Sequence, residues 1–263
     1  MDVILNHKEQ SKQGEMMTRV YLIRHGQTDT NIHGGFNGMR TDLPLNETGE
    51  KMVQTLTPVF AEIPLDVIYV SPLRRAMQTA EWVRGEKEVP MLIEPQMQET
   101  DFGLLDGLSW KDGKARYPRE CRVWIRRPER FHPPGSSESV HDVWVRVFAA
   151  FLRIVRENRG KTVAIVAHGM VFTLLTSKLL GLSLHDYRLT PMPSNAAYRV
   201  LDVEDDGHVY IDRWEYDEHL EPQWVLSRKN LRQRLRRAWR RIPRRGYHPA
   251  LRMTKKELKS YGN

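Results

Sequence analysis

The sequence predicts an α/β fold with a mostly parallel central sheet. Apolar runs at residues 20–23 and 162–167 are short and uninterrupted, which is typical of strands buried on both faces of a sheet. Helical patterns alternate with the strand-like runs, as parallel sheets require. Each run is followed within two residues by a histidine, His25 or His168. Ligands of open α/β sheets collect at the carboxyl ends of strands, so we expect both imidazoles in one pocket.

The first half of the chain shows five further elements of this alternation, three helices and two strands. Ser71 and Pro72 predict a helix start, because serine caps helices and proline is tolerated at the first helical position. Ser109 and Asp112 predict a short helix that Gly113 and Pro118 limit. The remaining expected elements are a loop over residues 31–46, a helix from about residue 47, and strands at residues 66–70 and 91–93.

The clearest helix follows the Pro-Pro-Gly of residues 133–135. An apolar stripe recurs there at helical spacing, Gly160 lies just past its end, and we expect the stripe to face the core. Its members are Val140, Val143, Trp144, Val147, Phe148, Phe151, Leu152 and Val155. The later strand at 162–167 leads into a helix of about residues 170–180. Residues 204–207, Glu-Asp-Asp-Gly, then predict a hairpin between two short strands.

Composition predicts one catalytic body with two extensions. The chain has 263 residues, of which 40% are hydrophobic, and no apolar run approaches membrane-spanning length. The lone Cys121 excludes an internal disulfide framework and, with no signal-peptide core at the start, favours a cytoplasmic location. We expect an N-terminal extension at 1–16, a catalytic domain at 17–227 and a basic tail at 228–263.

The basic character of the chain is confined to its tail. Residues 228–263 hold 14 Lys or Arg against one acidic residue, Glu257, which gives them a net charge of +13. The total of +8 therefore leaves −5 for residues 1–227. Apolar residues recur near helical spacing between Leu231 and Ile242, so a basic amphipathic helix is predicted. It would bind an anionic membrane surface, a nucleic acid or an acidic protein, or pack on the acidic body with its arginines solvated.

Four motifs resemble the histidine phosphatase (phosphoglycerate mutase-like) superfamily. They are Arg-His-Gly at 24–26, an Asn six residues after that His, Ser-Pro-Leu-x-Arg-Ala at 71–76 and His-Gly at 168–169. The resemblance runs from about residue 18 to residue 212. It implies a three-layer α/β/α architecture around the mostly parallel sheet, extended here by the basic helical tail.

The resemblance assigns a role to five side chains. His25 is the expected nucleophile, since a neutral imidazole can attack phosphorus and form a phosphohistidine. Arg24 and Arg75 are the expected phosphate clamps, because guanidinium groups bind phosphate oxygens in bidentate fashion. His168 is expected to bind the transferring phosphoryl group. Glu99 matches the general acid that protonates the leaving alcohol, a role that needs a raised pKa.

Further residues match weaker parts of the pattern. Asn31, Asn37 and Gly38 match phosphate-contacting positions, although the family usually carries Gln where Asn37 stands, and Asn37-Gly38 equally suits a plain turn. Backbone N–H groups at Gly169 open a helix and can bind an anion. The other histidines show no paired ligand spacing and no Gly-rich nucleotide loop is present, so no metal and no cofactor are predicted.

One motif has two interpretations. Ser137-Glu138-Ser139, with Arg146 seven residues later, resembles a Gly-Glu-Ser…Arg motif of the family in which Ser replaces Gly. Ser137 and Glu138 also suit a helix start, so the segment either caps that helix or contacts substrate.

The sequence favours a phosphatase. Its acid segment, Glu99-Thr100-Asp101-Phe102-Gly103, differs from the Glu-Arg-x-Tyr-Gly of mutases that need a phosphorylated cofactor. The alternatives are such a mutase, for which Arg126 and Arg127 are a paired-arginine candidate, and a catalytically silent scaffold acting through its tail. We expect a small phosphorylated metabolite as substrate, and we expect residues 110–131 and 190–194 to shape the pocket for its alcohol half. A homodimer is in keeping with the family.

Overall fold

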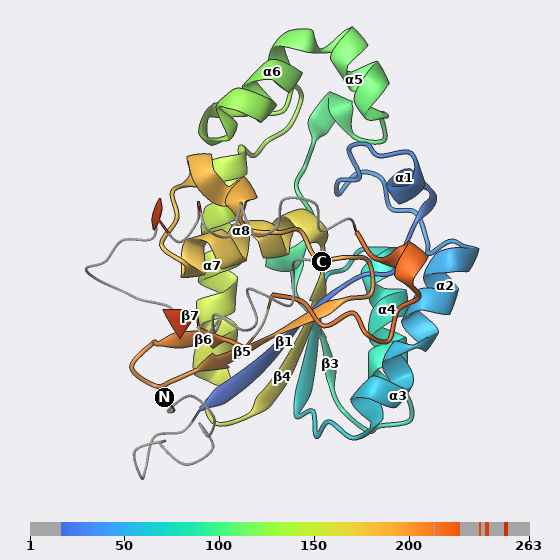
Figure 1. The fold of residues 1–263 in the computed structure, drawn as a ribbon, viewed down its shortest axis with the longest axis vertical. Helices are drawn as coiled ribbons and strands as arrows, with labels where there is room; N and C mark the ends of the chain where they lie inside the picture. The colour runs from blue at the N-terminus through green and yellow to red at the C-terminus, as the bar shows by residue number, and fades with distance from the viewer. Residues whose placement is uncertain (1–16, 213, 227–236, 238–239, 242–249, 252–263) are drawn as a thin grey trace, which may run out of the picture.

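A mixed β-sheet forms the centre of the molecule in the computed structural model (Figure 1). The structure describes residues 17–212, 214–226, 237, 240–241 and 250–251. Within these ranges the strand order is β3-β2-β4-β1-β5-β6-β7. The strands are β1 (Thr18–Arg24), β2 (Val67–Val70), β3 (Met91–Ile93), β4 (Thr162–Ala167), β5 (Tyr198–Val203), β6 (Val209–Ile211) and β7 (Ala250–Leu251).

The prediction of a mostly parallel sheet is corrected to a mixed one. β1 to β4 are parallel, but β5 runs antiparallel to both β1 and β6. The reason lies in the connection that follows α8 (Gly169–Leu179). The chain returns through the 3₁₀ helix η4 (Leu184–Leu189) to the carboxyl edge of β1, where Ala196 N–H donates to the Arg24 carbonyl, and so enters β5 from that edge. The predicted hairpin at 204–207 joins β5 to β6 and is confirmed.

Helices cover both faces of the sheet, which gives three layers. Val20 and Leu22 of β1 belong to the core under α7 (Val140–Glu157) and α8, whereas Tyr21 and Ile23 belong to the core under the helices of the other face. Those helices are α2 (Glu47–Gln54), α3 (Leu56–Ala61) and α4 (Arg74–Arg84). This alternation shows that β1 is buried on both faces, as its uninterrupted apolar run predicts.

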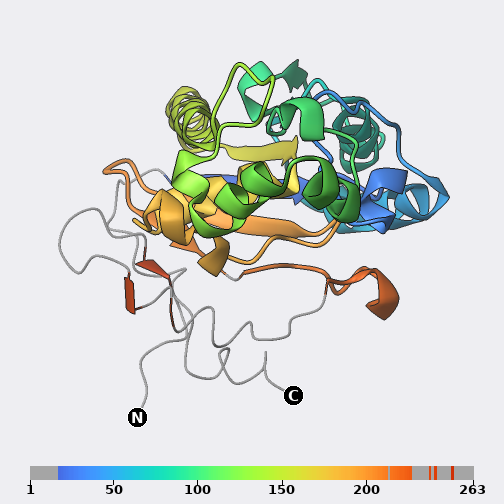
Figure 2. The ribbon, with the colours of Figure 1, turned by 90° about the horizontal axis from the view of Figure 1, so that it is seen from above.

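Two short helices form a further tier beyond the carboxyl ends of the strands. α5 (Trp110–Arg116) and α6 (Pro118–Arg126) stand at the top of Figure 1 and lie across the middle of the molecule when seen from above in Figure 2. The predicted cap of α5 is confirmed, because Ser109 Oγ accepts the Asp112 N–H at 3.1 Å. α1 (Asp29–Ile32) follows β1, and the other 3₁₀ helices are η1 (Pro95–Met97), η2 (Gly103–Leu105), η3 (Pro128–Arg130) and η5 (Pro222–Trp224).

The predicted start of α4 is wrong by two residues. The helix begins at Arg74 with Leu73 as its N-cap, and the carboxylate of Asp42 accepts the Arg74 N–H at 2.7 Å. Ser71 does not cap the helix because its hydroxyl forms a hydrogen bond of 2.7 Å with the ring of His168. The serine therefore belongs to the site at the strand ends.

The predicted core stripe of α7 is only partly right. Val140, Val143, Val147 and Phe151 are buried as expected, but Leu152 is 42% exposed. A residue is turned by about 100° from its neighbour in a helix, so the position after Phe151 faces away from the sheet. Ala150 and Ile154, which the prediction omitted, are buried instead.

The predicted tail helix falls almost wholly outside the described residues. Arg237, Arg240 and Arg241 are described and exposed, and Arg241 forms an ion pair with Asp186 of η4. The N-terminal extension at 1–16 lies outside as well. Among the described helices, none has both the length and the apolarity needed to cross a lipid bilayer.

Candidate active site

The two motif histidines lie side by side at the carboxyl edge of the sheet. β1 ends at Arg24 and β4 ends at Ala167, and the His25 N–H donates to the Ala167 carbonyl at 3.0 Å. His168 follows β4 directly. The centroids of the two imidazole rings are 5.1 Å apart, and both side chains are buried. The two imidazoles are therefore neighbours, as expected.

The His25 ring is held neutral with one nitrogen available for attack. Its Nδ1 lies 2.6 Å from the Gly26 carbonyl oxygen, and a carbonyl only accepts, so Nδ1 carries the proton. Nε2 therefore bears the lone pair. Burial, followed by the positive charges of Arg75 and Arg24, lowers the pKa of His25 well below its usual range. The imidazole is thus neutral, with its single proton on Nδ1.

Two residues that the sequence analysis did not select hold the backbone around His25. Asn195 Nδ2 donates to the His25 carbonyl at 3.0 Å and to the Gly26 carbonyl at 3.2 Å. Thr79 Oγ1 accepts the Gly26 N–H at 3.0 Å. Asn195 is about 170 positions from His25 in the chain, so no local pattern signals the contact.

Two guanidinium groups are buried beside the histidines with donors unused. Arg24 Nη1 donates to the Pro193 carbonyl and Arg75 Nη1 donates to the Thr41 carbonyl, but Nε of each arginine is buried and has no acceptor. Burial lowers the pKa of Arg24 to about 10 and also lowers that of Arg75. Leaving a buried donor unpaired costs roughly 1–3 kcal/mol, and more for a charged group. Such a pair of arginines indicates a binding site for an anion.

Gly169 permits the close approach of Arg24. A Cβ atom at Gly169 would lie 2.9 Å from Arg24 Nε and 3.0 Å from Arg24 Cζ. The Sδ atom of Met192 would also be 3.0 Å away. Any side chain at this position would therefore displace the guanidinium group from the start of α8.

Glu99 lies against the start of α8. Its Oε2 accepts the Met170 N–H at 3.1 Å, and its Oε1 accepts the Thr100 N–H at 2.8 Å. Burial raises the pKa of the Glu99 carboxyl, although these two hydrogen bonds and the charges of Arg75 and Arg24 oppose that rise. A buried carboxyl with a raised pKa beside a phosphate-type site has the properties of a proton donor.

An ion pair braces the segment that carries Glu99. Arg146 of α7 donates to the carbonyls of Gln98 at 3.0 Å and Glu99 at 3.2 Å, and its Nε pairs with Glu138 at 2.8 Å. Glu138 in turn accepts the Asp101 N–H at 3.0 Å. The helix cap is Ser139, which accepts the Asp142 N–H, so capping is not the role of Glu138. Glu138 and Arg146, from the motif with two interpretations, thus hold in place the segment that carries Glu99.

These groups surround a cavity of about 760 Å³. Six of the nine sequence-predicted site residues line it, namely Arg24, His25, Asn31, Asn37, Glu99 and Gly169. Gly38, Arg75 and His168 lie behind that lining: His168 is fully buried against Ser71, and Arg75 donates to the Gly38 carbonyl at 3.0 Å.

Known proteins are similar to this chain in sequence and in fold. A sequence model of the histidine phosphatase superfamily (branch 1) matches residues 20–217. The chain belongs to this superfamily. Phosphoserine phosphatase 1 of Hydrogenobacter thermophilus is 30% identical over 196 residues, which are 74% of this chain and 91% of that protein.

A mutase and a solved phosphatase structure are similar as well. A 2,3-bisphosphoglycerate-dependent phosphoglycerate mutase of Brucella anthropi is 32% identical over 64% of this chain and 84% of its own length. The structure of a mycobacterial glucosyl-3-phosphoglycerate phosphatase superposes with a TM-score of 0.68 at 25% identity, covering 75% of this chain and 98% of that one. The family match and the phosphatases among the relatives together identify this chain as a phosphoric monoester hydrolase.

The loop after His25 presents two asparagines to the cavity of this histidine phosphatase. Asn31 Oδ1 accepts the Thr28 N–H at 3.0 Å, while Asn37 Nδ2 donates to Thr28 Oγ1 and Asn37 Oδ1 has no partner. Gly38 does not face the cavity, because its N–H donates to Asp106 at 2.9 Å. A Cβ at Gly38 would lie 2.4 Å from that carboxylate. Gly38 therefore supports the loop rather than lining the cavity.

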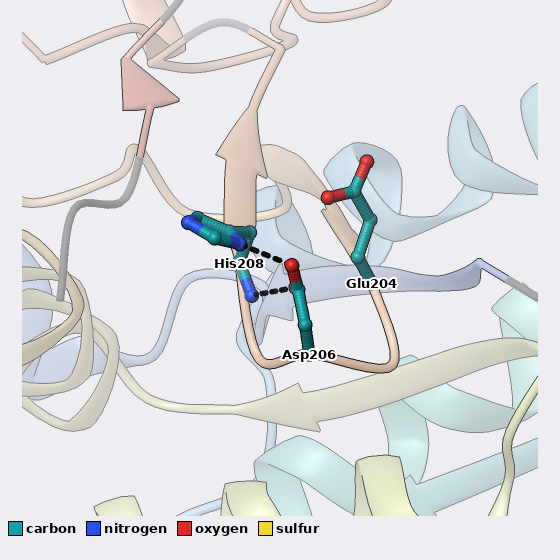
Figure 3. A group of neighbouring side chains, drawn as sticks. All are labelled: Glu204, Asp206 and His208. Atoms are coloured by element: carbon teal, nitrogen blue, oxygen red, sulfur yellow. Dashed lines mark hydrogen bonds and ion pairs between the residues drawn. The ribbon is translucent and has the colours of Figure 1, made fainter. Parts of the chain in front are cut away.

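A second group of ligand-type side chains lies on the β5–β6 hairpin, where Figure 3 shows Glu204, Asp206 and His208. One ligand atom from each lies within 4.8 Å of the others. Asp206 already accepts from the backbone N–H of His208 at 2.9 Å and is bonded to its ring at 2.6 Å. Asp206 and His208 are exposed, and the hydrogen bonds account for the arrangement, so we assign no ligand to it.

Proposed function

We propose that this protein hydrolyses phosphomonoesters through a phosphohistidine on His25, without a metal ion. The observation that carries the proposal is the neutral His25 ring, whose Nε2 bears a lone pair, beside two buried guanidinium groups with unused donors. A phosphate group supplies the acceptors that Arg24 and Arg75 lack. Positioning and charge stabilisation are most of what phosphoryl transfer needs from a protein.

The reaction proceeds in two steps at this site. His25 Nε2 attacks phosphorus, and the bond to the alcohol oxygen breaks as Glu99 gives that oxygen its proton. Water then attacks the phosphohistidine, with Glu99 taking the proton from the water, which restores His25 and releases phosphate. Arg24, Arg75 and His168 stabilise the charge on the transferring group. Asn31 and Asn37 are the further phosphate contacts of this proposal, with the N-terminal backbone of α8 at Gly169.

The structure favours hydrolysis over phosphoglycerate interconversion. A mutase of this superfamily must also hold the carboxylate of its substrate, and the paired-arginine candidate was Arg126 and Arg127. Both side chains are exposed, and neither lines the cavity. The substrate is proposed to be a small phosphorylated metabolite, the kind of compound that the names of the relatives indicate.

The test is phosphate release from 4-nitrophenyl phosphate in excess chelator, comparing the wild type with His25→Ala. We expect turnover in chelator and a loss of roughly 10³-fold or more in the variant. His33→Ala, which removes an exposed histidine from the neighbouring loop, is the matched control and should keep wild-type activity. Turnover that needs a divalent ion, or that survives His25→Ala, would contradict the proposal.

Four predictions from the sequence are kept as proposals. They are the segment boundaries 1–16, 17–227 and 228–263, a cytoplasmic location, a homodimer, and binding of an anionic membrane surface or a nucleic acid by the tail. The family match over residues 20–217 supports the extent proposed for the catalytic domain.

A further inference from the structure

The cavity extends well beyond the space that a phosphate group occupies, and its outer part is aromatic. The lining residues outside the phosphate end include Phe36, Phe102, Trp110, Trp124 and Tyr187. They come from five separate segments: the loop after α1, the segment after Glu99, α5, α6 and η4. Both segments expected to shape the alcohol site, residues 110–131 and 190–194, contribute to the lining.

The five rings form one continuous wall. Phe36 packs on Trp110 with ring centroids 5.4 Å apart and edge-to-face on Phe102 at 5.2 Å. Phe102 packs edge-to-face on Trp124 at 5.5 Å, and Trp124 reaches Tyr187 at 6.2 Å. Each inner ring thus contacts two others, so the wall is already ordered before a ligand arrives.

A cation closes one end of this wall. Arg188 lines the cavity with its Cζ 4.7 Å from the centroid of Trp124 and 4.8 Å from that of Tyr187. Its Nη1 also donates to the Ile125 carbonyl of α6 at 3.2 Å. The stacked guanidinium therefore braces α6 against η4 and adds a planar cationic surface, which favours an electron-rich ring.

We infer that the alcohol half of the substrate carries a planar aromatic ring that packs against this wall. The inference rests on the proposed phosphatase function and names its substrate class. A small polar alcohol such as serine would leave the half-buried rings of Trp110 and Trp124 facing water, whereas an aromatic group removes apolar surface from water on both sides. Glu99 is the only acidic residue among the described residues that line the cavity, and it is needed at the phosphate end.

The decisive comparison uses two substrates with similar leaving groups. 3-Phenylpropyl phosphate and n-propyl phosphate both release a primary alcohol, so a difference in kcat/KM reports binding of the ring and not bond strength. We expect kcat/KM to be roughly 10- to 100-fold higher for the phenyl compound, the range expected for burying one aromatic side chain. Trp110→Leu and Trp124→Leu should remove most of this preference, which is measured in each variant as the ratio of the two kcat/KM values.

Trp144→Leu is the matched control. Trp144 is a half-buried tryptophan of α7 that packs with Lys178 and does not line the cavity. This variant should keep the full preference. If Trp144→Leu loses as much preference as the two wall variants, the wall is not the subsite, and the inference is overturned.

A binding measurement separates this inference from the proposed function. Titration of His25→Ala with 3-phenylpropylphosphonate and with n-propylphosphonate needs no turnover. Tighter binding of the phenyl compound, lost in Trp124→Leu, supports the subsite even if phosphate release proves independent of His25. Equal affinities and equal kcat/KM for the two compounds overturn it, while His25-dependent turnover of both would leave the phosphatase proposal intact.

Discussion

The protonation states of His25 and Glu99 follow from the groups that surround each side chain. The carbonyl of Gly26 selects the His25 tautomer with the proton on Nδ1, and burial beside Arg24 and Arg75 keeps the ring neutral. Burial shifts the pKa of Glu99 in the opposite direction, because it raises the pKa of a carboxyl. The two shifts favour a neutral imidazole and a protonated carboxyl in one cavity.

Glu99→Gln should change both the rate and the pH profile. The acid must be protonated, so kcat/KM of the wild type should fall as pH rises through the raised pKa of Glu99, and the variant should lose this part of the fall. His25 must be neutral, and its lowered pKa puts the acidic fall at low pH in both proteins. Ionisation of the substrate phosphate is common to both and cancels in their ratio.

The leaving group provides the internal control for Glu99. We expect Glu99→Gln to lower kcat/KM for alkyl phosphates by roughly 10²- to 10⁴-fold, the usual contribution of a positioned acid. The loss for 4-nitrophenyl phosphate should be much smaller, because nitrophenolate leaves as a stable anion. Equal losses with the two substrate types would show that Glu99 is not the acid.

At the scale of elements, the start of α8 and the segment that carries Glu99 position the side chains of the site. The sequence motifs predicted the position of Arg24, His25 and His168 at strand ends, because Arg-His-Gly and His-Gly are contiguous with strong apolar runs. The contacts of Asn195, Thr79 and Ser71 escaped prediction, since their partners are far away in the chain. The same is true of the aromatic wall, whose rings come from five segments.

Gly169→Ala should impair activity without loss of stability. Alanine at the first position of α8 is compatible with a helix, but its Cβ would push against the Arg24 guanidinium. We expect kcat/KM to fall roughly 10- to 100-fold, as displacement of a positioning group by about 1 Å does. Steady-state kinetics and thermal unfolding are the measurements. A wild-type kcat/KM would show that the Arg24 position is not critical.

Arg146 is expected to act as a positioning residue for Glu99. Arg146→Lys keeps the charge but loses the fork that binds Glu138 and the carbonyls of Gln98 and Glu99. We expect kcat/KM to fall roughly tenfold for alkyl phosphates and little for 4-nitrophenyl phosphate. Arg156→Lys changes an exposed arginine of the same helix and is the control. A uniform loss on both substrates would indicate a purely structural role.

At the scale of the whole molecule, an acidic body carries a basic tail. The three layers could be predicted, because uninterrupted apolar strands must be covered on both faces. The direction of β5 could not, because it depends on where the loop through η4 returns to the sheet, which no periodicity encodes. The pair between Arg241 and Asp186 links the tail to η4, although exposed pairs of this kind contribute little to stability.

A chain ending at Ser227 should separate the two parts. Among the residues that the structure describes, those lining the cavity all precede this position, so we expect kcat/KM for 4-nitrophenyl phosphate to be unchanged. Binding of duplex DNA or of anionic vesicles by the full chain should weaken steeply as salt rises and should vanish on truncation. Loss of activity in the shortened chain would instead make the tail part of the catalytic body.

The phosphohistidine itself can be observed most directly by trapping it. 4-Nitrophenyl phosphate phosphorylates the nucleophile without help from an acid, so the intermediate should accumulate in a single turnover quenched in alkaline detergent. With a labelled phosphoryl group in the substrate, we predict that the label appears on His25. This label should be stable in alkali, lost in acid and absent from His25→Ala. Label on any other residue, or turnover of the wild type at the same rate with no labelled protein, would contradict nucleophilic catalysis by His25.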